Sequence, residues 1–281
     1  MSNKGILYLV ATPIGNLDDI TYRAVKILNE VDVIAAEDTR HSLKLLNHLG
    51  ISKPLISYHR HNEDNKTEVL INKLLDGDNI ALITDAGTPA ISDPGEEVVK
   101  QAINNDIEII PVPGACALIN ALIASGMNTK EFVFIGFLPL NKKLRKNKFE
   151  EIKQENKTII LYEAPHKINQ TLKDLSEELG NVNIVIAREL TKIHEEFIRG
   201  KINDIIACYP EIKGEIIILI EGNNTTNSND EIKDILNNMS LEEHYNYYKN
   251  KELSKKEIIK KIAKDRNVNK NDIYMKLIDF E

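Results

Sequence analysis

The first part of the chain alternates short apolar runs with segments in which apolar residues recur every three or four positions. The short apolar runs predict buried strands. They span residues 5–10, 31–36, 54–58, 79–84 and 107–112. Helical patterns lie between them, over residues 18–31, 42–50, 67–76 and 96–105, the first of them capped by Asp18 or Asp19. Strands separated by such helices are typical of βαβ units, so the sequence predicts a mostly parallel sheet.

A second α/β unit follows. Helices are expected over residues 115–124 and 166–179, and apolar strands over 132–137, 158–162, 183–187 and 215–221. Residues 196–202 are expected to form an antiparallel partner strand. The pattern therefore predicts an α/β protein with an N-terminal domain over residues 1–113, a second α/β domain over 114–224 and an extension over 225–281.

The extension begins in a polar, low-complexity linker at residues 223–230. Only helical patterns follow, over residues 231–238, 241–250, 255–265 and 271–279. Ser254 and Glu257 have the spacing of a capping box. A small helix-turn-helix-like core is expected from Ile258, Ile262, Ala263, Val268 and Ile273.

Length and composition exclude several classes of protein. The chain has 281 residues, 42% hydrophobic and 28% charged, which is ordinary for a globular protein. Its two cysteines exclude a disulfide framework and a multi-cysteine zinc site. An apolar run of about 18 residues, the length that spans a membrane, is absent. The first residues lack the apolar core of a signal peptide, so a soluble cytoplasmic protein is expected.

The charge is unevenly distributed. A net charge of −7 argues against a simple polycation that coats nucleic acid. Residues 249–276 nevertheless hold ten Lys and Arg against four acidic residues, and residues 142–148 hold five cations. Each basic run by itself is compatible with a solvated surface. Two such runs on an acidic chain favour a polyanionic partner.

Three loops rich in Pro and Gly follow predicted strands, at residues 11–16, 84–95 and 111–115. Ligands of open parallel sheets bind outside the carboxyl ends of the strands, where Gly and Pro keep backbone groups accessible and the loop rigid. The loops indicate a small-molecule site held largely by main chain, although any one of them is explained by ordinary turn formation. The nucleotide fingerprints G-x-G-x-x-G and G-x-x-x-x-G-K-[ST] are absent, which weakens an NAD or ATP interpretation.

Several long motifs occur in order along residues 5–222. They are LVATPIGNLDDIT at 9–21, AAEDTR at 35–40, ISYH at 56–59 followed by HNE at 61–63, TDAGTPAISDPG at 84–95, VPG at 112–114, FLP at 137–139, YEAPHK at 162–167, and ARELTK at 187–192 followed by HEE at 194–196. With them the chain resembles the tetrapyrrole-methylase superfamily of S-adenosylmethionine enzymes, and within it the branch that methylates ribosomal RNA. The tetrapyrrole-modifying branches usually carry G-A-G-P-G and G-D-P where this chain has ATPIG and DAGTP, which favours the RNA branch.

The resemblance implies a fold, a cofactor and a reaction. It implies two α/β domains with S-adenosylmethionine in the cleft between them, and a homodimer. The reaction would be methyl transfer to the ribose 2′-oxygen of a cytidine in the decoding region of 16S rRNA, in the small ribosomal subunit. Carried over by motif, the cofactor-binding residues would be Pro13, Asp85, Ala86, Gly87, Ala90, Ile91, Ser92, Pro113, Gly114, Ala115, Tyr162, Glu163 and Ala187.

Catalytic candidates lie in two polar turns. Asp38 or His59 could accept the proton of the hydroxyl, and Arg40 could hold a phosphate. The alternatives are helix capping for Asp38 and an ordinary loop role for His59. His59 and His61 have no further paired ligands at a suitable spacing, so no metal is expected. The expected RNA contacts are Lys142, Lys143, Arg145, Lys146, Lys148, Lys255 and Lys256.

Two other functions stay open at this point. One is a methyltransferase that acts on a tetrapyrrole precursor, which would need an apolar trough and no basic extension. The other is a non-catalytic RNA-binding assembly factor that has kept the fold.

Overall fold

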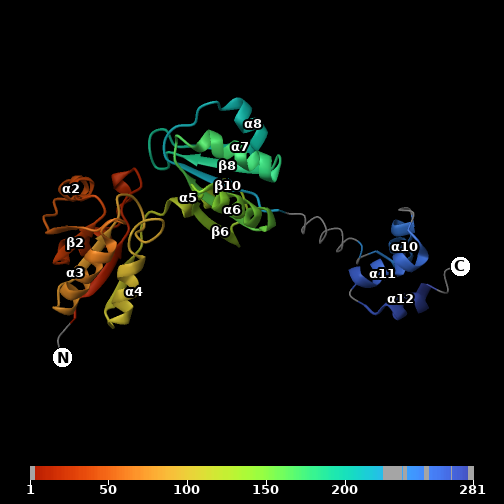
Figure 1. The fold of residues 1–281 in the computed structure, drawn as a ribbon, viewed down its shortest axis with the longest axis horizontal. Coiled ribbons are helices and arrows are strands. Elements are labelled where there is room, and N and C mark those ends of the chain that lie inside the picture. The colour runs from red at the N-terminus through yellow and green to blue at the C-terminus, as the bar shows by residue number, and fades with distance from the viewer. Residues whose placement is uncertain (1–3, 224–235, 237–238, 250–252, 267, 278–281) are drawn as a thin grey trace. The chain divides into compact units, whose positions relative to one another are not determined.

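The structure is a computed structural model that describes residues 4–223, 236, 239–249, 253–266 and 268–277 (Figure 1). The chain divides into two compact units, residues 1–221 and residues 222–281. The predicted helix over 231–238 and most of the predicted linker lie outside the described residues, apart from Leu236 in the former and Asn223 in the latter. In the part of the chain that is described, no helix combines the length and the apolar character that a membrane span requires.

The first sheet of the N-terminal unit is entirely parallel, as predicted. Its strands are β1 (Ile6–Val10), β2 (Val33–Ala36), β3 (Leu55–Ser57), β4 (Ile80–Ile83) and β5 (Glu108–Val112), in the order β3-β2-β4-β1-β5. Four helices cover it: α1 (Tyr22–Glu30), α2 (Thr39–His48), α3 (Glu63–Leu75) and α4 (Glu96–Asn104). Alternate strand residues pack against α3 and α4 on one face and against α1 and α2 on the other.

The parallel arrangement places the carboxyl ends of all five strands at one edge. Two of the loops at this edge, those after β1 and β4, are joined by backbone hydrogen bonds. The Thr12 N–H donates to the Gly87 carbonyl over 2.9 Å, and the Gly87 N–H donates to the Thr12 carbonyl over 3.1 Å. The Thr88 hydroxyl donates to the Ala115 carbonyl over 3.0 Å and so adds the loop after β5. The three Pro/Gly loops therefore form one connected surface.

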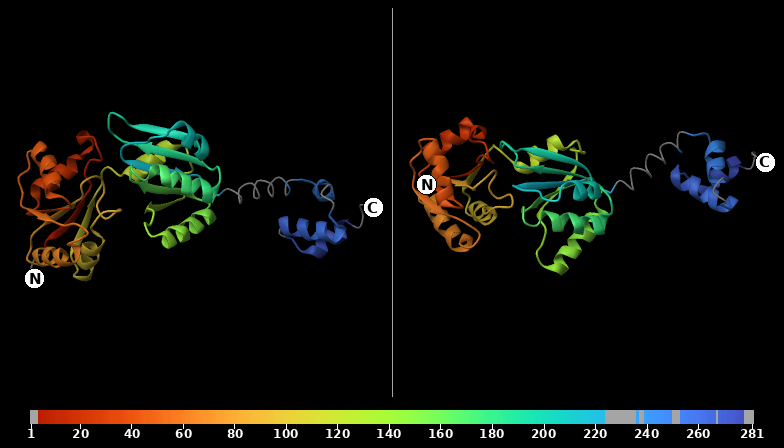
Figure 2. Two further views of the ribbon diagram at one scale, coloured as in Figure 1. Left: turned by 45° about the horizontal axis from the view of Figure 1, so that its top comes forward. Right: turned by 90° about the horizontal axis from the view of Figure 1, so that it is seen from above.

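The second sheet is mixed. Its strands are β6 (Phe132–Phe137), β7 (Thr158–Glu163), β8 (Asn183–Arg188), β9 (Glu196–Lys201) and β10 (Ile216–Ile220), in the order β6-β7-β10-β8-β9. Only β6 and β7 are parallel, and β9 pairs antiparallel with β8, as predicted. One face packs against α5 (Ala117–Ser125), and the other against α6 (Lys142–Gln154), α7 (Ile168–Leu179) and α8 (Ile202–Cys208) (Figure 2).

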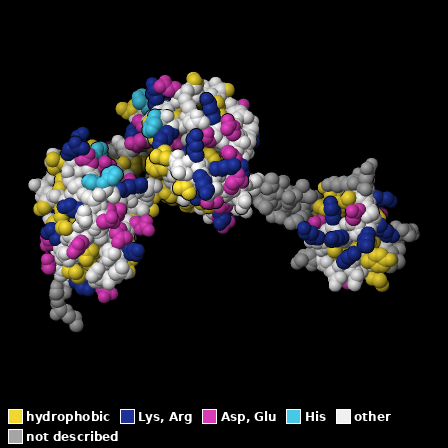
Figure 3. Space-filling view, viewed as in Figure 1, with side chains coloured by type: hydrophobic (Ala, Val, Ile, Leu, Met, Phe, Trp, Pro, Cys, Tyr) yellow, Lys and Arg dark blue, Asp and Glu magenta, His cyan; other side chains and the backbone are white. Residues whose placement is uncertain are grey.

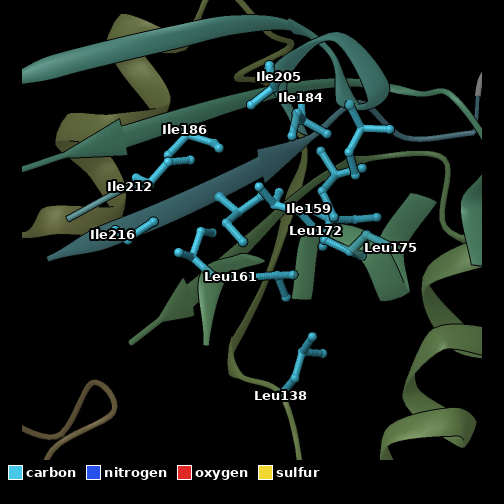
Figure 4. Close-up of a cluster of buried hydrophobic side chains, with 14 of the residues drawn as sticks. Leu138, Ile159, Leu161, Leu172, Leu175, Ile184, Ile186, Ile205, Ile212 and Ile216 are labelled. Carbon is cyan, nitrogen blue, oxygen red and sulfur yellow. The ribbon is translucent and has the colours of Figure 1, made fainter. Parts of the chain in front are cut away.

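The face toward α7 holds a continuous aliphatic cluster (Figure 4). Ile159 and Leu161 of β7 lie there with Ile184 and Ile186 of β8, while Ile160 between them points to the face of α5. This alternation is the two-residue period of a strand that is buried on both sides. The sequence predicted these apolar strands for that reason.

Some helix boundaries differ from the prediction. Asp18 and Asp19 do not cap α1; they lie in a separate 3-10 turn (Leu17–Asp19), and the Thr21 side chain accepts the Ala24 N–H instead. Helix α2 begins before Ser42, at Thr39. Helix α3 begins at residue 63, four residues before the predicted start. In α2 and α3, polar residues of the first turn hide the apolar period.

Two helices were not predicted, α6 and α8. Helix α6 coincides with the first basic run, and it buries only Phe149 and Ile152. A helix with so few buried positions has almost no apolar period for sequence analysis to detect. Helix α8 is short and directly follows β9, and its first residue, Ile202, falls within the strand that the sequence predicts over residues 196–202.

The C-terminal unit contains α10 (Leu241–Lys249), α11 (Lys255–Asp265) and α12 (Lys270–Leu277). The capping box is confirmed, because the Ser254 N–H donates to Glu257 Oε2 over 3.0 Å. Ile258, Ile262, Ala263 and Ile273 are buried as predicted. Val268 is wrong as a core residue, since its side chain is 45% exposed. Leu277 and Tyr248 are buried in this core although neither was assigned to it.

A buried histidine connects α10 to the end of α11. The Arg266 Nε donates to His244 Nδ1 over 3.1 Å, and His244 Nε2 lies 3.3 Å from the Asp265 carboxylate. Burial of the imidazole, and then the nearby guanidinium, lower the pKa of His244. The Tyr248 hydroxyl donates to the same Asp265 carboxylate over 2.6 Å. This small core is therefore fixed by a polar network as well as by aliphatic packing.

Candidate functional site

The first cavity of the N-terminal unit has a volume of about 360 Å³, in the usual range for small-molecule sites. The loop after β4 provides one wall through residues 86–88 and 91–93. The second sheet and its loops provide the opposite wall through residues 162–165, 190 and 215–217. Ile14, Cys116, Ala117 and Phe137 complete the lining. The cavity thus lies where the loops of the parallel sheet face the second sheet.

Aromatic side chains meet at one side of this cavity. The Tyr162 ring lies 5.0 Å from the ring of Phe134 and 5.8 Å from that of Phe137, both in edge-to-face contact. Burial raises the pKa of Tyr162 to about 12, so its phenol stays protonated and can donate a hydrogen bond. This side therefore combines apolar ring surface with one hydroxyl donor.

Carboxylates gather behind the loop after β4. Burial, and then repulsion by Glu37, raise the pKa of Asp93 to about 6, although Arg60 attracts the ionised form. The Thr84 hydroxyl donates to Glu37 Oε2 over 2.7 Å, which keeps this second carboxylate in place. Asp93 itself lines the cavity. A cation in the cavity would relieve the repulsion that Asp93 experiences.

Glu163 lines the same cavity but is already engaged. Its Oε2 accepts the Thr171 hydroxyl over 2.6 Å, and its Oε1 accepts the Ala164 N–H over 2.8 Å. The side chain is buried. Its carboxylate therefore fixes the turn between β7 and α7.

A second cavity, of about 520 Å³, adjoins the first. Its lining comprises Pro13, Ile14, Gly15, Leu17, His41, Ser42, Lys44, Leu45, Thr84, Asp85, Ala86, Lys192 and Glu215. Ile14, Ala86 and Glu215 line both cavities, so the two spaces share a wall. The second cavity contains no aromatic ring of Phe or Tyr, and its polar side chains include hydroxyl, imidazole, ammonium and carboxylate groups.

A strained turn holds Lys192 at this cavity. Lys192 Nζ lies 3.1 Å from Glu189 Oε1 and 3.2 Å from Glu215 Oε2. Glu189 and Thr191 have φ angles of 51° and 67°, in the left-handed region that costs free energy for residues with a side chain. A Cβ atom at Gly15 would lie 2.6 Å from Lys192 Cγ. The loop after β1 therefore approaches this turn closely because residue 15 is glycine.

The residues expected to bind the cofactor fall into three groups. Those that line the first cavity are Ala86, Gly87, Ile91, Ser92, Tyr162 and Glu163. Pro13 and Asp85 line the second cavity. Those that line neither cavity are Ala90, Pro113, Gly114, Ala115 and Ala187.

The members of this last group lie in or beside the loops and strands that carry the lining residues. Ala187 is buried against the face that α5 covers. A Cβ atom at Gly114 would lie 2.8 Å from the Ala11 Cβ, so the two loops are in close contact. Ala90 has a φ angle of 66° within the loop after β4.

The expected catalytic residues line neither cavity. Asp38 caps α2 and accepts two hydrogen bonds from the Arg40 guanidinium, over 3.1 and 2.8 Å. These bonds hold the pKa of Asp38 well below its ordinary value, which makes its carboxylate a weak proton acceptor. The His59 Nδ1 is buried without a hydrogen-bond partner among the described residues. The catalytic roles of Asp38, Arg40 and His59 stay predictions.

The cationic side chains of the first basic run, residues 142–148, differ in exposure and pairing along α6. Arg145 Nη2 lies 2.8 Å from Asp174 Oδ2 and donates to the Thr171 hydroxyl over 2.9 Å. Lys148 pairs with Glu151 one turn away. Lys142, Lys143 and Lys146 are exposed. The three exposed lysines thus form the accessible part of this run.

Sequence reasoning missed Asp93, His41 and Ser42 as lining residues. Asp93 lies inside the long motif after β4, so a signal existed, but nothing in the sequence shows its burial. His41 and Ser42 follow Asp38 on the first turns of α2 and line the second cavity. Their spacing in the sequence did not indicate this position. In the described residues, no group of three or more His, Cys, Asp or Glu could hold a metal ion.

Known proteins resemble this chain closely. The family model of the tetrapyrrole (corrin/porphyrin) methylases matches residues 6–206. A Halalkalibacterium halodurans protein named ribosomal RNA small subunit methyltransferase I is 49% identical over 97% of this chain and 94% of its own length. Proteins with the same name from Bacillus subtilis and Synechocystis are 47% and 55% identical, over 97% and 78% of this chain and 94% and 79% of their own lengths.

Solved structures share the fold at low identity. Uroporphyrin III C-methyltransferase from Thermus thermophilus is 14% identical, with a TM-score of 0.56 over 77% of this chain and 97% of that one. Diphthine synthase is 12% identical, with a TM-score of 0.58 over 77% of this chain and 90% of that one. The two-sheet fold is thus a known architecture, and the chain belongs to the tetrapyrrole (corrin/porphyrin) methylase family.

Proposed function

We propose that the chain transfers a methyl group from S-adenosylmethionine to the ribose 2′-oxygen of a cytidine in the decoding region of 16S rRNA. The observation that carries the proposal is the near-full-length similarity, at 49% identity, to a protein named ribosomal RNA small subunit methyltransferase I. The ribose position and the cytidine follow from the resemblance of the motifs to the RNA branch of the superfamily. The cavities and the basic surfaces supply the physical support.

The first cavity fits S-adenosylmethionine. This molecule has an aromatic base, which matches the ring surface of Tyr162 and Phe137, and a permanent positive charge at sulfur. Asp93 is a half-buried carboxylate at this cavity, and its pKa is raised by burial and then by repulsion from Glu37, so a nearby cation would stabilise its ionised form. Gly87 and Ala86 provide the backbone surface of the loop after β4. The donor would therefore lie between that loop and β7.

When bound, S-adenosylmethionine supplies an activated methyl group: the S–CH₃ bond breaks with its electron pair going to sulfur, the O–CH₃ bond forms, and the hydroxyl proton leaves to water. The contribution of this chain is to hold the donor and the acceptor in line and to exclude competing water. Positioning of this kind can lower a barrier by several kcal/mol, up to roughly 7–11. The rigid loops joined by Thr12 and Gly87 are suited to that task.

Basic surfaces would bind the RNA backbone. One is the exposed face of α6 with Lys142, Lys143 and Lys146. Another is α11, which carries Lys255 and Lys256 on its first turn. Figure 3 shows Lys and Arg side chains over the described part of the C-terminal unit. Phosphate contacts by such residues position an RNA without selecting its sequence.

We also propose that the chain forms a homodimer. Three large apolar side chains between β6 and the first turn of α6 are exposed, namely Phe137 (55%), Leu140 (78%) and Leu144 (56%). Large apolar side chains exposed within one short segment favour burial in a protein interface. A second copy of this chain would bury Leu140 and Leu144.

The proposed reaction is tested by incubating the purified chain with labelled S-adenosylmethionine. Small ribosomal subunits from cells that lack the chain and, separately, a tetrapyrrole precursor serve as acceptors. We expect label only in 16S rRNA, recovered by nucleoside analysis as 2′-O-methylcytidine. Label in the tetrapyrrole would contradict the acceptor, and failure to bind S-adenosylmethionine in calorimetry would support a non-catalytic RNA-binding factor.

Donor binding should depend on pH through Asp93. The carboxylate form attracts the cationic donor, and its pKa of about 6 means that protonation competes with binding below that value. Calorimetry should show that the affinity for S-adenosylmethionine falls by up to about tenfold per pH unit below pH 6. S-adenosylhomocysteine, which lacks the sulfonium charge, should show a weaker dependence.

Two variants control this measurement. Asp93→Asn should bind the donor more weakly and lose the dependence near pH 6. Asp64→Asn, on the exposed side of α3, should behave as wild type. An unchanged pH profile in Asp93→Asn would exclude Asp93 from donor binding.

Replacing the exposed lysines of α6 should weaken RNA binding. In the Lys142→Gln/Lys143→Gln/Lys146→Gln variant, loss of three phosphate contacts should lower the salt slope of subunit binding by about 2. The affinity for S-adenosylmethionine should not change. Arg145→Gln serves as the contrast: it should lower the melting temperature, because Arg145 binds Asp174 and Thr171. A wild-type salt slope in the triple variant would remove α6 from the RNA surface.

Light scattering tests the homodimer. We expect the wild-type chain to have the mass of two chains, and Leu140→Glu/Leu144→Glu to have the mass of one, because a carboxylate cannot be buried unpaired in an apolar interface. Ile103→Glu places the same charge at an exposed apolar residue of α4 and should leave the mass unchanged. A wild-type mass of one chain would contradict the proposal.

A further inference from the structure

The second cavity contains a buried hydroxyl that the fold does not use. The Ser42 side chain is 2% exposed, and its Oγ has no hydrogen-bond partner among the described residues. Ser42 lies on α2 and lines the cavity. Buried polar groups without a partner destabilise the folded state and are rare in folded proteins. A ligand in the cavity would supply the missing partner.

The other polar groups of this cavity include both hydrogen-bond acceptors and hydrogen-bond donors. Asp85 and Glu215 offer carboxylates that accept hydrogen bonds, while Lys192 and Lys44 offer ammonium groups that donate. Lys44 is exposed at α2, whereas Lys192 is half-buried and paired with Glu189 and Glu215. The hydroxyls of a sugar both donate and accept, and a phosphate requires cations. The lining therefore matches a ribose with a phosphate beside it.

A flat macrocycle matches the lining less well. Such an acceptor would need a broad apolar surface, and Leu17 and Leu45 with Pro13 and Ile14 supply only short aliphatic side chains. No aromatic ring of Phe or Tyr lines the second cavity. The lining thus favours a sugar–phosphate ligand over a ring system.

The second cavity lies in a position suited to the acceptor of the methyl group. Ile14, Ala86 and Glu215 line both cavities, so a ligand in the second cavity would meet the donor cavity across this shared wall. Ile14 and Ala86 belong to the two loops that the Thr12–Gly87 hydrogen bonds join. Two ligands held by joined loops keep a fixed separation, which in-line transfer requires.

We propose that the second cavity is the acceptor subsite, which takes the ribose and an adjoining phosphate of the target nucleotide, with Ser42 as a hydrogen-bond donor to the sugar–phosphate and Lys44 as a phosphate contact. This proposal rests on the proposed function, because it takes RNA as the acceptor. It adds the location of the acceptor and the residues that recognise it.

Ser42→Ala tests the subsite directly. The kcat/KM for methylation of small ribosomal subunits from cells that lack the chain should fall by about tenfold, the value of one hydrogen bond to the ligand. The Kd for S-adenosylmethionine in calorimetry should stay at the wild-type value. The melting temperature should be unchanged or higher, since the substitution removes an unpartnered buried hydroxyl. A purely structural Ser42 would give a lower melting temperature and no specific change in kcat/KM.

Lys44→Gln is the second variant. Because Lys44 is exposed, this substitution tests the subsite without changing a buried residue. It should raise the KM for subunits and lower the salt slope of subunit binding by about 0.7. Lys100→Gln is the matched control, since Lys100 is an exposed lysine of α4 that lines neither cavity, and it should behave as wild type.

The possible failures are distinguishable. If the wild-type chain methylates no rRNA, the proposed function fails and the nucleotide assignment of this cavity fails with it. If the wild-type chain methylates rRNA but Ser42→Ala and Lys44→Gln both keep wild-type kcat/KM and salt slope, the subsite alone is overturned. A loss of donor affinity in Ser42→Ala would instead assign this part of the cavity to the donor.

Discussion

The pair of backbone hydrogen bonds between Thr12 and Gly87 is the contact on which the site depends. It joins the loops after β1 and β4, and each loop contributes to both cavities. Gly87 has a φ angle of 88°, and a Cβ atom there would lie 3.1 Å from Ile14 Cγ2. A side chain at residue 87 would therefore strain the backbone and disturb the shared wall at once. The parallel sheet makes the contact possible, because it brings both strand ends to one edge.

Charge is organised differently on the two sides of the shared wall. The first cavity has a half-buried carboxylate, Asp93, whose pKa is raised by burial and by Glu37. The second cavity has the ammonium groups of Lys44 and Lys192 beside the carboxylates of Asp85 and Glu215. A cationic donor in the first cavity would be attracted by Asp93, and an anionic backbone at the second would be attracted by the exposed Lys44. The wall between them is formed mainly by the small or aliphatic side chains of Ile14 and Ala86, which let two ligands approach closely.

Several polar residues of this region serve the fold. Glu163 holds the turn before α7, Asp38 caps α2, and Arg145 binds α7 through Asp174. Each is fully engaged with partners of its own unit. Ser42 is the contrast, because its hydroxyl is buried without such a partner in the described part of the chain. Stabilising interactions explain the first set, whereas the proposed acceptor would supply a partner for the Ser42 hydroxyl.

The sequence by itself determined the strands, the parallel first sheet and the family. Apolar runs such as residues 79–84 are unambiguous, since a strand buried on both faces must be continuously apolar. It did not determine the polar helix α6, because a helix that buries two residues has almost no period to detect. Motifs assigned Gly87 and Tyr162 to the cofactor site, and both line the first cavity, yet the motifs could not separate Pro13 and Asp85 into a second cavity. Burial and pairing between residues far apart in the chain decided that separation. They also decided the pKa of Asp93 and left the Ser42 hydroxyl without a partner in the described part of the chain. Such burial and pairing arise only when the loops are folded against the second sheet.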